Sequence, residues 1–186
     1  MQKLTYGQLA KLVNSAKQGD ESAFAALYAA TVESQLYFAT AFLQDSFLAE
    51  DAVQATYMSL FESLHRLENP RLLVAYLNRI CYNTCANMLK KSSRLKGELD
   101  EDKLTYVNDS TVAHNPANSY LVLERNHEIY SALSVLPEQQ KAMFLMRYYH
   151  NMKIQEIAIS LETSESTVKR GLKAAAAMLE PVFKHN

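Results

Sequence analysis

The stretch "IQEIAISLETSESTVKRGLKAAAAML", residues 154–179, has the spacing of two short helices that meet at a turn. Apolar residues recur at intervals of three and four on both sides of the turn, which is the spacing of a buried helix face. The first set is Ile154, Ile157, Ala158 and Leu161, and the second is Val168, Leu172, Ala175 and Leu179. Ser164 lies between them and has the side chain of a helix N-cap. The stretch therefore predicts either a helix-turn-helix or a helical hairpin that only packs.

Polar and basic residues lie opposite the apolar stripe of the second helix. They are Ser166, Lys169, Arg170 and Lys173. Glu165 is the only acidic residue between Thr163 and Leu179, and it lies at the helix start, where the helix dipole favours a negative charge. The second helix of a DNA-binding helix-turn-helix places such side chains in the major groove. We therefore interpret this stretch as a DNA-reading element.

The charge of the chain is low for a protein that binds DNA by itself. The net charge is -1 over 186 residues, with +1 in residues 1–95, -4 in residues 96–135 and +2 in residues 136–186. Neutralisation of phosphates dominates non-specific affinity for DNA. A unit with a charge of +2 should bind DNA weakly, so the distribution predicts a partner that supplies affinity.

Composition and periodicity predict an all-α protein of two helical domains. Hydrophobic residues make up 48% of the chain, and only four Gly and four Pro interrupt it. We expect domains at residues 1–95 and 117–186, joined by an acidic linker at 96–116 that has no sustained periodicity. Neither a signal peptide nor an apolar run of membrane-spanning length is visible, so we expect a cytoplasmic protein.

Apolar spacing predicts the individual helices. In the first domain we expect a helix stopped by Gly19, a second capped by Asp20 or Ser22, and a third that ends near Asp45. A fourth helix should turn one face inward, formed by Val53, Tyr57, Leu60, Phe61 and Leu64. A long fifth helix should end in the cations Lys90, Lys91 and Arg94. In the second domain, helices should begin at Asn115-Pro116 and at Pro137, the latter ending near His150-Asn151.

Residues that could carry catalysis or bind a metal do not gather into a known pattern. Cys81 and Cys85 are four apart on a predicted helix, and the five histidines are scattered. We expect buried thiols there, with no metal, cofactor or disulfide. The sequence contains no nucleophile elbow or glycine-rich phosphate loop, so we do not expect an enzyme.

Five motifs occur in a fixed order along the chain. They are "AKQGDESAFAALY", "LAEDAVQATYMSLF", "AYLNRICYNTCANMLKK", "LPEQQKAMFLMRYYHNMKIQEIA" and "STVKRGL". With these motifs the chain resembles an extracytoplasmic-function (ECF) sigma factor of bacterial RNA polymerase, over about residues 8–95 and 117–180. Such proteins contain sigma domains two and four joined by a linker, and they direct core polymerase to promoters.

The resemblance implies roles for particular residues. Polymerase binding, on the clamp helices of the β′ subunit, falls to Glu50, Asp51 and Gln54; from the residues alone these would be a solvated acidic face. Reading and melting of the minus-ten promoter element falls to the loop from Leu67 to Leu73 and to Tyr76, Arg79, Asn83, Asn87, Lys90 and Lys91. A flipped base needs a pocket, a stacking surface and amides that both donate and accept hydrogen bonds.

The minus-thirty-five element falls to the second domain, through Arg147, Ser166, Thr167, Lys169, Arg170 and Lys173. The implied partners are core polymerase (β′ clamp and β subunits), promoter DNA and an anti-sigma factor. In this interpretation polymerase supplies the affinity and the sigma factor selects the sequence.

The chain departs from the family pattern at several positions. Gly171 and Ala174 stand where relatives often carry Arg, and Tyr76 stands where Trp is common. Glu162 replaces a turn glycine, at a cost of about 1 kcal/mol if that position needs a positive φ. Thr163 replaces an apolar residue in the same turn. The alternative function is a sigma-like adaptor that binds an anti-sigma factor or polymerase without selecting promoters.

Overall fold

The computed structural model describes residues 4–99 and 132–184, and every regular element within these ranges is helical. This confirms the predicted all-α class. The elements are α1 (Tyr6–Lys17), α2 (Glu21–Leu43), α3 (Ser46–Ser63), the short 3-10 helices η1 (Leu64–Arg66) and η2 (Pro70–Leu72), α4 (Leu73–Leu99), α6 (Glu138–Tyr148), α7 (Ile154–Ser160) and α8 (Glu165–Lys184). None of these helices is long and apolar enough to cross a membrane.

Side-chain caps fix where the helices begin. The Asp20 carboxylate accepts hydrogen bonds from the backbone N–H groups of Ser22 and Ala23 at the start of α2. Asp45 accepts from Leu48 N–H at the start of α3, at 3.0 Å, and Ser164 accepts from Thr167 N–H at the start of α8, at 3.1 Å. Each cap satisfies a backbone donor that the first turn of a helix leaves without a partner. The predicted caps at Asp20 and Ser164 are thus confirmed.

Two helix boundaries differ from the prediction. The expected second and third helices form one helix, α2, which ends only where Gln44 takes a left-handed conformation with φ 58°. Because α2 contacts α1, α3, α4 and α6, its apolar residues face several directions and show no single period. The helix expected to end at Lys90–Arg94 continues to Leu99 as α4 and includes the start of the predicted linker. The rest of the linker and the expected helix start at Asn115-Pro116 lie outside the described residues.

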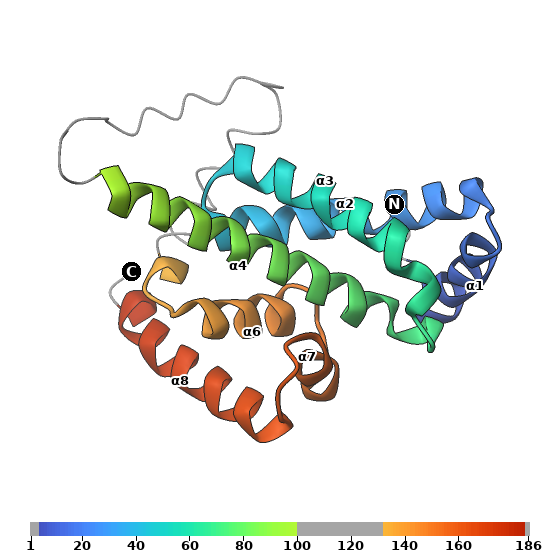
Figure 1. Cartoon of the computed structure of the whole chain (residues 1–186). Helices are drawn as coiled ribbons and strands as arrows, with labels where there is room; N and C mark the ends of the chain where they lie inside the picture. Colours follow the sequence, from blue (N-terminus) through green and yellow to red (C-terminus); the bar gives the residue numbers. More distant parts are fainter. Residues whose placement is uncertain (1–3, 100–131, 185–186) are drawn as a thin grey trace, which may run out of the picture.

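Helix α4 runs through the middle of the molecule, with α2 and α3 along one side and α6, α7 and α8 along the other (Figure 1). Its buried residues include Leu77, Cys81 and Cys85. One continuous cluster of buried apolar residues extends from Leu9 in α1 to Leu179 in α8. The two helical domains therefore pack against each other, and α4 contributes a face to each side.

Candidate nucleic-acid interface and polymerase-binding surface

A pocket of about 550 Å³ opens between the end of α3 and the first half of α4. It is lined by Ser59, Ser63, Arg66, Tyr76, Arg79, Ile80, Asn83, Thr84 and Asn87. The α4 residues in this set recur at intervals of three and four, so they project from one face of the helix. The volume lies within the range of small-ligand sites, roughly 300–1,000 Å³.

Four of the residues predicted to read the minus-ten element meet in this pocket: Tyr76, Arg79, Asn83 and Asn87. The amides of Asn83 and Asn87 are exposed, whereas the Tyr76 ring is half-buried against the core. The Tyr76 hydroxyl donates to the Ser63 carbonyl oxygen at 3.4 Å, which ties the ring to the end of α3. The aromatic ring thus packs on one side and lines the pocket on the other.

The prediction did not include the pocket residues on α3 and η1, nor Ile80 and Thr84 on α4. Ser59 and Ser63 lie four residues apart beside the apolar stripe of α3, and the Ser63 hydroxyl donates to the Ser59 carbonyl at 2.5 Å. Arg66 lines the pocket from η1. The sequence contained one sign of this border: Ser59 and Ser63 are small polar residues next to the apolar stripe of α3. Only the packing of α3 on α4 shows that they border the same space.

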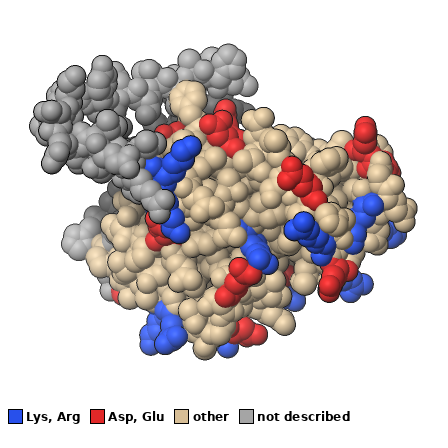
Figure 2. All heavy atoms as spheres, in the orientation of Figure 1, with Lys and Arg blue, Asp and Glu red and all other residues tan. Residues whose placement is uncertain are grey.

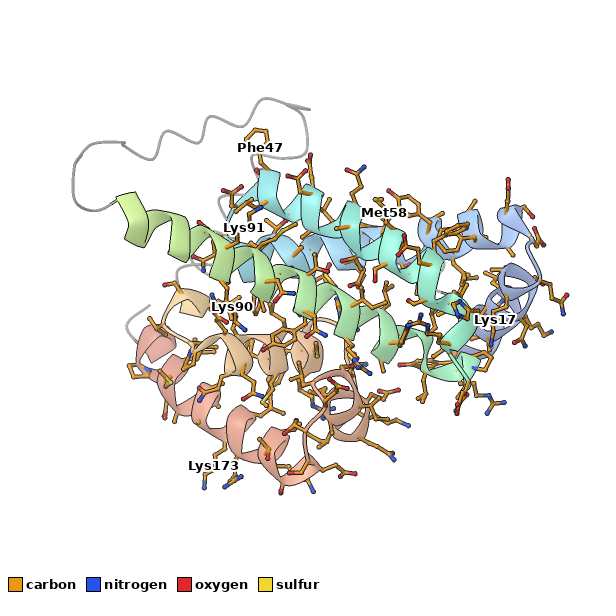
Figure 3. All side chains as sticks on the ribbon, in the orientation of Figure 1. Lys17, Phe47, Met58, Lys90, Lys91 and Lys173 are labelled. Atoms are coloured by element: carbon orange, nitrogen blue, oxygen red, sulfur yellow. The ribbon has the colours of Figure 1, made fainter. Side chains whose placement is uncertain are left out.

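Other residues predicted for the minus-ten element lie elsewhere. The side chains of Leu67 and Leu73 are 6% and 1% exposed, so in this structure they anchor the loop in the core and line no DNA surface. The Lys17 ammonium donates to the Leu67 carbonyl at 3.0 Å and holds the loop against α1. Lys90 and Lys91 are exposed further along α4, beyond the pocket (Figure 3).

The helix-turn-helix forms as predicted from α7, a short turn and α8. Val168, Ala175 and Leu179 are buried, while Lys169, Arg170 and Lys173 are exposed. Figure 3 shows Lys173 projecting from α8 away from the rest of the molecule. The hydroxyl of Ser164 lies 2.8 Å from that of Ser166 and 2.9 Å from that of Thr167. The first turn of α8 therefore presents small hydroxyls next to an outer face of cations.

Gly171 has a packing role that the sequence did not reveal. A Cβ atom at this position would overlap the sulfur of Met143, a buried residue of α6. Glycine permits this close approach of α6 and α8 because it has no side chain. A larger side chain at position 171 would require the Met143 side chain to move, so the helix contact gives a packing reason for glycine here. The missing cation is therefore weaker support for an adaptor that has lost DNA recognition.

Arg147, predicted to touch DNA, has an internal contact in this structure. Its Nη1 donates to the carbonyl oxygen of Met152 at 2.8 Å. The bond closes the loop between α6 and α7, in which Asn151 takes a left-handed conformation with φ 53°. Helix α6 ends at Tyr148, close to the predicted end at His150-Asn151.

An exposed stripe runs along α3. The predicted polymerase-binding residues Glu50, Asp51 and Gln54 all lie on it. Three large apolar side chains that the prediction did not assign to polymerase binding lie on the same stripe: Phe47, Met58 and Phe61, which are 66%, 61% and 65% exposed. We call these six residues the α3 outer face; Phe47 and Met58 are labelled on α3 in Figure 3.

The position of Phe61 corrects the prediction that it faces the core. Its ring meets the ring of Phe24 edge to face, with 5.2 Å between the centroids, but it stays largely in solvent. The core-facing positions of this segment are filled instead by Leu60 and Leu64. Exposed clusters of large apolar residues mark sites of protein–protein contact.

Polar contacts join the two domains along what we call the seam. The Ser160 hydroxyl of α7 donates to the Ala75 carbonyl of α4 at 3.0 Å. The Met152 sulfur, in the loop before α7, lies 3.2 Å from Asn78 Nδ2 of α4. The amide of Asn78 also accepts from Gln35 Nε2 at 3.1 Å. Asn78 and Ser160 are 0% and 1% exposed, so the seam contains buried, bonded polar groups. Such groups specify one arrangement of the packed surfaces.

The seam continues between α2 and α6. The rings of Tyr37 and Tyr149 stack with 3.6 Å between centroids, and His150 Nε2 lies 3.1 Å from the Ser34 carbonyl oxygen. The Lys141 ammonium lies 3.5 Å from the Phe42 carbonyl oxygen. Burial lowers the pKa of Lys141 because it disfavours the charged form.

The outer end of the seam is an ion pair. Arg79 Nη2 lies 2.6 Å from Oε1 of Glu162, the residue in the turn before α8. Glu162 has φ 49°, so the expected positive φ at this position is present. The ion pair joins a residue of the α3–α4 pocket to the turn of the helix-turn-helix.

The two cysteines are free and buried in α4. Contact with Cys81 and burial raise the pKa of the Cys85 thiol well above its usual range. A thiol held in this form reacts poorly. Within residues 4–99 and 132–184, no three His, Cys, Asp or Glu side chains come together as a metal site.

Acidic and basic side chains are interspersed on the face of the molecule seen in Figure 2. Among the described residues on that face, they form no broad area of one sign. Long-range attraction to DNA phosphates is weak for such a surface. The charges on this face thus agree with the near-zero charge of each domain.

Comparison with protein families places both domains. The model of sigma-70 region 2 matches residues 27–95, which include α3, α4 and the pocket. The model of sigma-70 region 4 matches residues 126–179, which include the helix-turn-helix. The chain belongs to the sigma-70 family. It is an RNA polymerase sigma factor of the ECF type, and the two matched regions are the two that the resemblance implied.

Individual relatives agree with this assignment. The sigma factor is 27% identical to the ECF RNA polymerase sigma factor SigX of Bacillus subtilis, over 86% of this chain and 85% of SigX. Its fold is similar to that of CnrH in complex with the cytosolic domain of CnrY, with a TM-score of 0.73 and 20% identity over 96% of this chain and 99% of that one. It is also similar to RpoE in complex with the anti-sigma factor NepR from Bartonella quintana, with a TM-score of 0.69 and 19% identity over 87% and 96% of the two chains.

Proposed function

We propose that this sigma factor directs core RNA polymerase to promoters by reading two DNA elements with two separate surfaces. The pocket between α3 and α4 takes an unpaired base of the minus-ten element, and the outer face of α8 enters the major groove at the minus-thirty-five element. The observation that carries the proposal is the pocket itself. It combines an aromatic ring, two exposed amides and two arginines, as recognition of single-stranded DNA requires.

The α3 outer face is the proposed site for core polymerase. Its acidic and amide residues lie beside exposed apolar side chains, an arrangement suited to a protein interface with an apolar centre. The proposed contact is with the clamp helices of the β′ subunit, in the cytoplasm. Because RpoE, a structural neighbour, has been solved with an anti-sigma factor, we include an anti-sigma factor among the proposed partners.

Binding of both elements requires the two domains to separate. The contact between Arg79 and Glu162 places the start of α8 next to the minus-ten pocket. Elements centred about 25 base pairs apart on straight B-DNA are separated by roughly 85 Å, at 3.4 Å per base pair. In the packed arrangement the surfaces cannot reach both elements, so the seam opens when the sigma factor joins polymerase on a promoter.

Run-off transcription with core polymerase on fragmented genomic DNA tests the proposed function. Wild-type protein should initiate at a limited set of sites that share two upstream elements. Arg170→Ala should lower the preference for an intact over a scrambled minus-thirty-five element by about 1–3 kcal/mol if its guanidinium pairs with a base edge. Lys173→Ala, as a phosphate-contact control, should weaken initiation on both templates alike.

Two outcomes would contradict parts of the proposal. Equal preference in Arg170→Ala and wild type would show that α8 does not read sequence through this residue. Core binding without initiation at any site would favour the sigma-like adaptor.

A further inference from the structure

Glu162 occupies a position that suits glycine better than glutamate. Its φ of 49° is left-handed, a conformation in which a side chain is strained. Strained residues of this kind cluster at sites where the conformation serves a function. Here the strained residue directs its carboxylate to Arg79, 2.6 Å away on the neighbouring domain.

Arg79 lines the pocket in which the minus-ten DNA is proposed to bind. A guanidinium binds carboxylate and phosphate oxygens through the same donors, in similar geometry. When Arg79 Nη2 donates to Glu162, that donor is not available to a DNA phosphate. The carboxylate therefore stands where a phosphate oxygen would bind.

We propose that Glu162 competes with single-stranded minus-ten DNA for Arg79. In the packed sigma factor the carboxylate holds the guanidinium; DNA that enters the pocket takes the guanidinium over and releases the turn before α8. This inference rests on the proposed role of Arg79 in DNA binding. Because linkage is reciprocal, the seam weakens DNA binding by the same factor by which DNA loosens the seam.

The size of the effect follows from the exposure of the pair. The side chains of Arg79 and Glu162 are 41% and 62% exposed, so water screens their attraction. Loss of an exposed ion pair changes an equilibrium by roughly 1.5- to 5-fold. Buried contacts such as those at Asn78 and Ser160 also hold the seam, and Glu162 makes its opening sensitive to DNA.

The test uses the full-length sigma factor without polymerase and a fluorescent single-stranded DNA of mixed sequence. Fluorescence anisotropy at low ionic strength should show that Glu162→Gln binds this DNA about 1.5- to 5-fold more tightly than wild type. Glu162→Gly should show the same gain, with the left-handed strain removed as well. The gain should shrink in about 1 M salt, where the Debye length is about 3 Å.

Glu165→Gln is the matched control, because it removes one negative charge three residues away in the first turn of α8. It should leave the affinity close to that of wild type. Equal gains for Glu165→Gln and Glu162→Gln would overturn the proposal, since a general change of charge would then explain both. Unchanged affinity in Glu162→Gln would overturn it directly.

An Arg79→Ala background separates this inference from the proposed function. In that background Glu162→Gln should give no gain, and a persistent gain would rule out competition for Arg79. If Arg79→Ala weakens DNA binding while Glu162→Gln matches wild type, only the inference about Glu162 fails. If Arg79→Ala leaves DNA binding unchanged, the proposed role of Arg79 fails, and the inference fails with it.

Discussion

Two asparagines five residues apart in α4 show how burial decides the role of a side chain. Asn78 is fully buried in the seam, where its amide contacts Gln35 and Met152. Asn83 is exposed and lines the pocket. The amide group is the same in both, but only the exposed one can exchange water for a base edge. The buried one contributes to stability, because its removal leaves a partner unsatisfied.

Asn78→Ala should lower the free energy of unfolding by about 1–3 kcal/mol, since the Gln35 amide would lose its partner in the core. Asn83→Ala is the matched control on the same helix and should stay within about 0.5 kcal/mol of wild type. Urea denaturation followed by circular dichroism measures both. Equal stabilities for the two variants would contradict the assignment of Asn78 to a buried polar network.

At the scale of the helices, periodicity predicted most of the fold. The stripes of α7 and α8 face the core, and their residues Ile157 and Val168 are buried as expected. The pattern failed for α2, which contacts helices on several sides. The pattern also failed for Phe61, because apolar spacing does not distinguish a phenylalanine that is exposed to solvent from one that is buried in the core.

The α3 outer face gives a prediction for polymerase binding. The double change Phe47→Ser and Met58→Ser should reduce co-purification with core polymerase by at least about 10-fold. This corresponds to a loss of about 1.4 kcal/mol of binding free energy, as expected when two residues at the centre of an interface are removed. Helicity should be unchanged, because both side chains are exposed. Asp51→Arg with Gln54→Ala should act in the same direction.

Tyr148→Ser, which alters a tyrosine that is 63% exposed on α6, is the control for loss of an exposed apolar ring. It should leave core binding as in wild type. Normal co-purification of the α3 double variant would remove the α3 outer face from the polymerase interface.

At the scale of the whole molecule, the packing of the two domains was not predictable from the sequence. Apolar spacing gives the faces of a helix, but it does not show that the Ala75 carbonyl accepts from Ser160 of the other domain. The pocket was predicted in part, because its α4 residues share a face and match a family motif. The α3 residues of the pocket and the ion pair between Arg79 and Glu162 could not be predicted, because they arise from contacts between elements that are distant in the sequence.

Met152→Asp should open the molecule. Met152 is fully buried in the seam beside Asn78, and a carboxylate there loses its hydration unless the domains separate. Small-angle X-ray scattering should show a larger radius of gyration than that of wild type, for which a compact chain of this length has an expected value of about 16 Å. Met178→Asp, at an exposed position of α8, should leave the radius unchanged. An unchanged radius in Met152→Asp, with helicity retained, would contradict the opening of the seam.

The seam also has a consequence for genetics. A selection for alleles that raise transcription from a weakly recognised promoter would favour substitutions that loosen the packed form. Such gain-of-function alleles should collect on the buried face of α4 and on α7, around Asn78 and Ser160, where no side chain reaches the proposed DNA surfaces. Loss-of-function alleles should collect instead on the neighbouring face of the same helix, around Asn83 and Asn87. Opposite phenotypes would then map to two different faces of a single α-helix, as at Asn78 and Asn83.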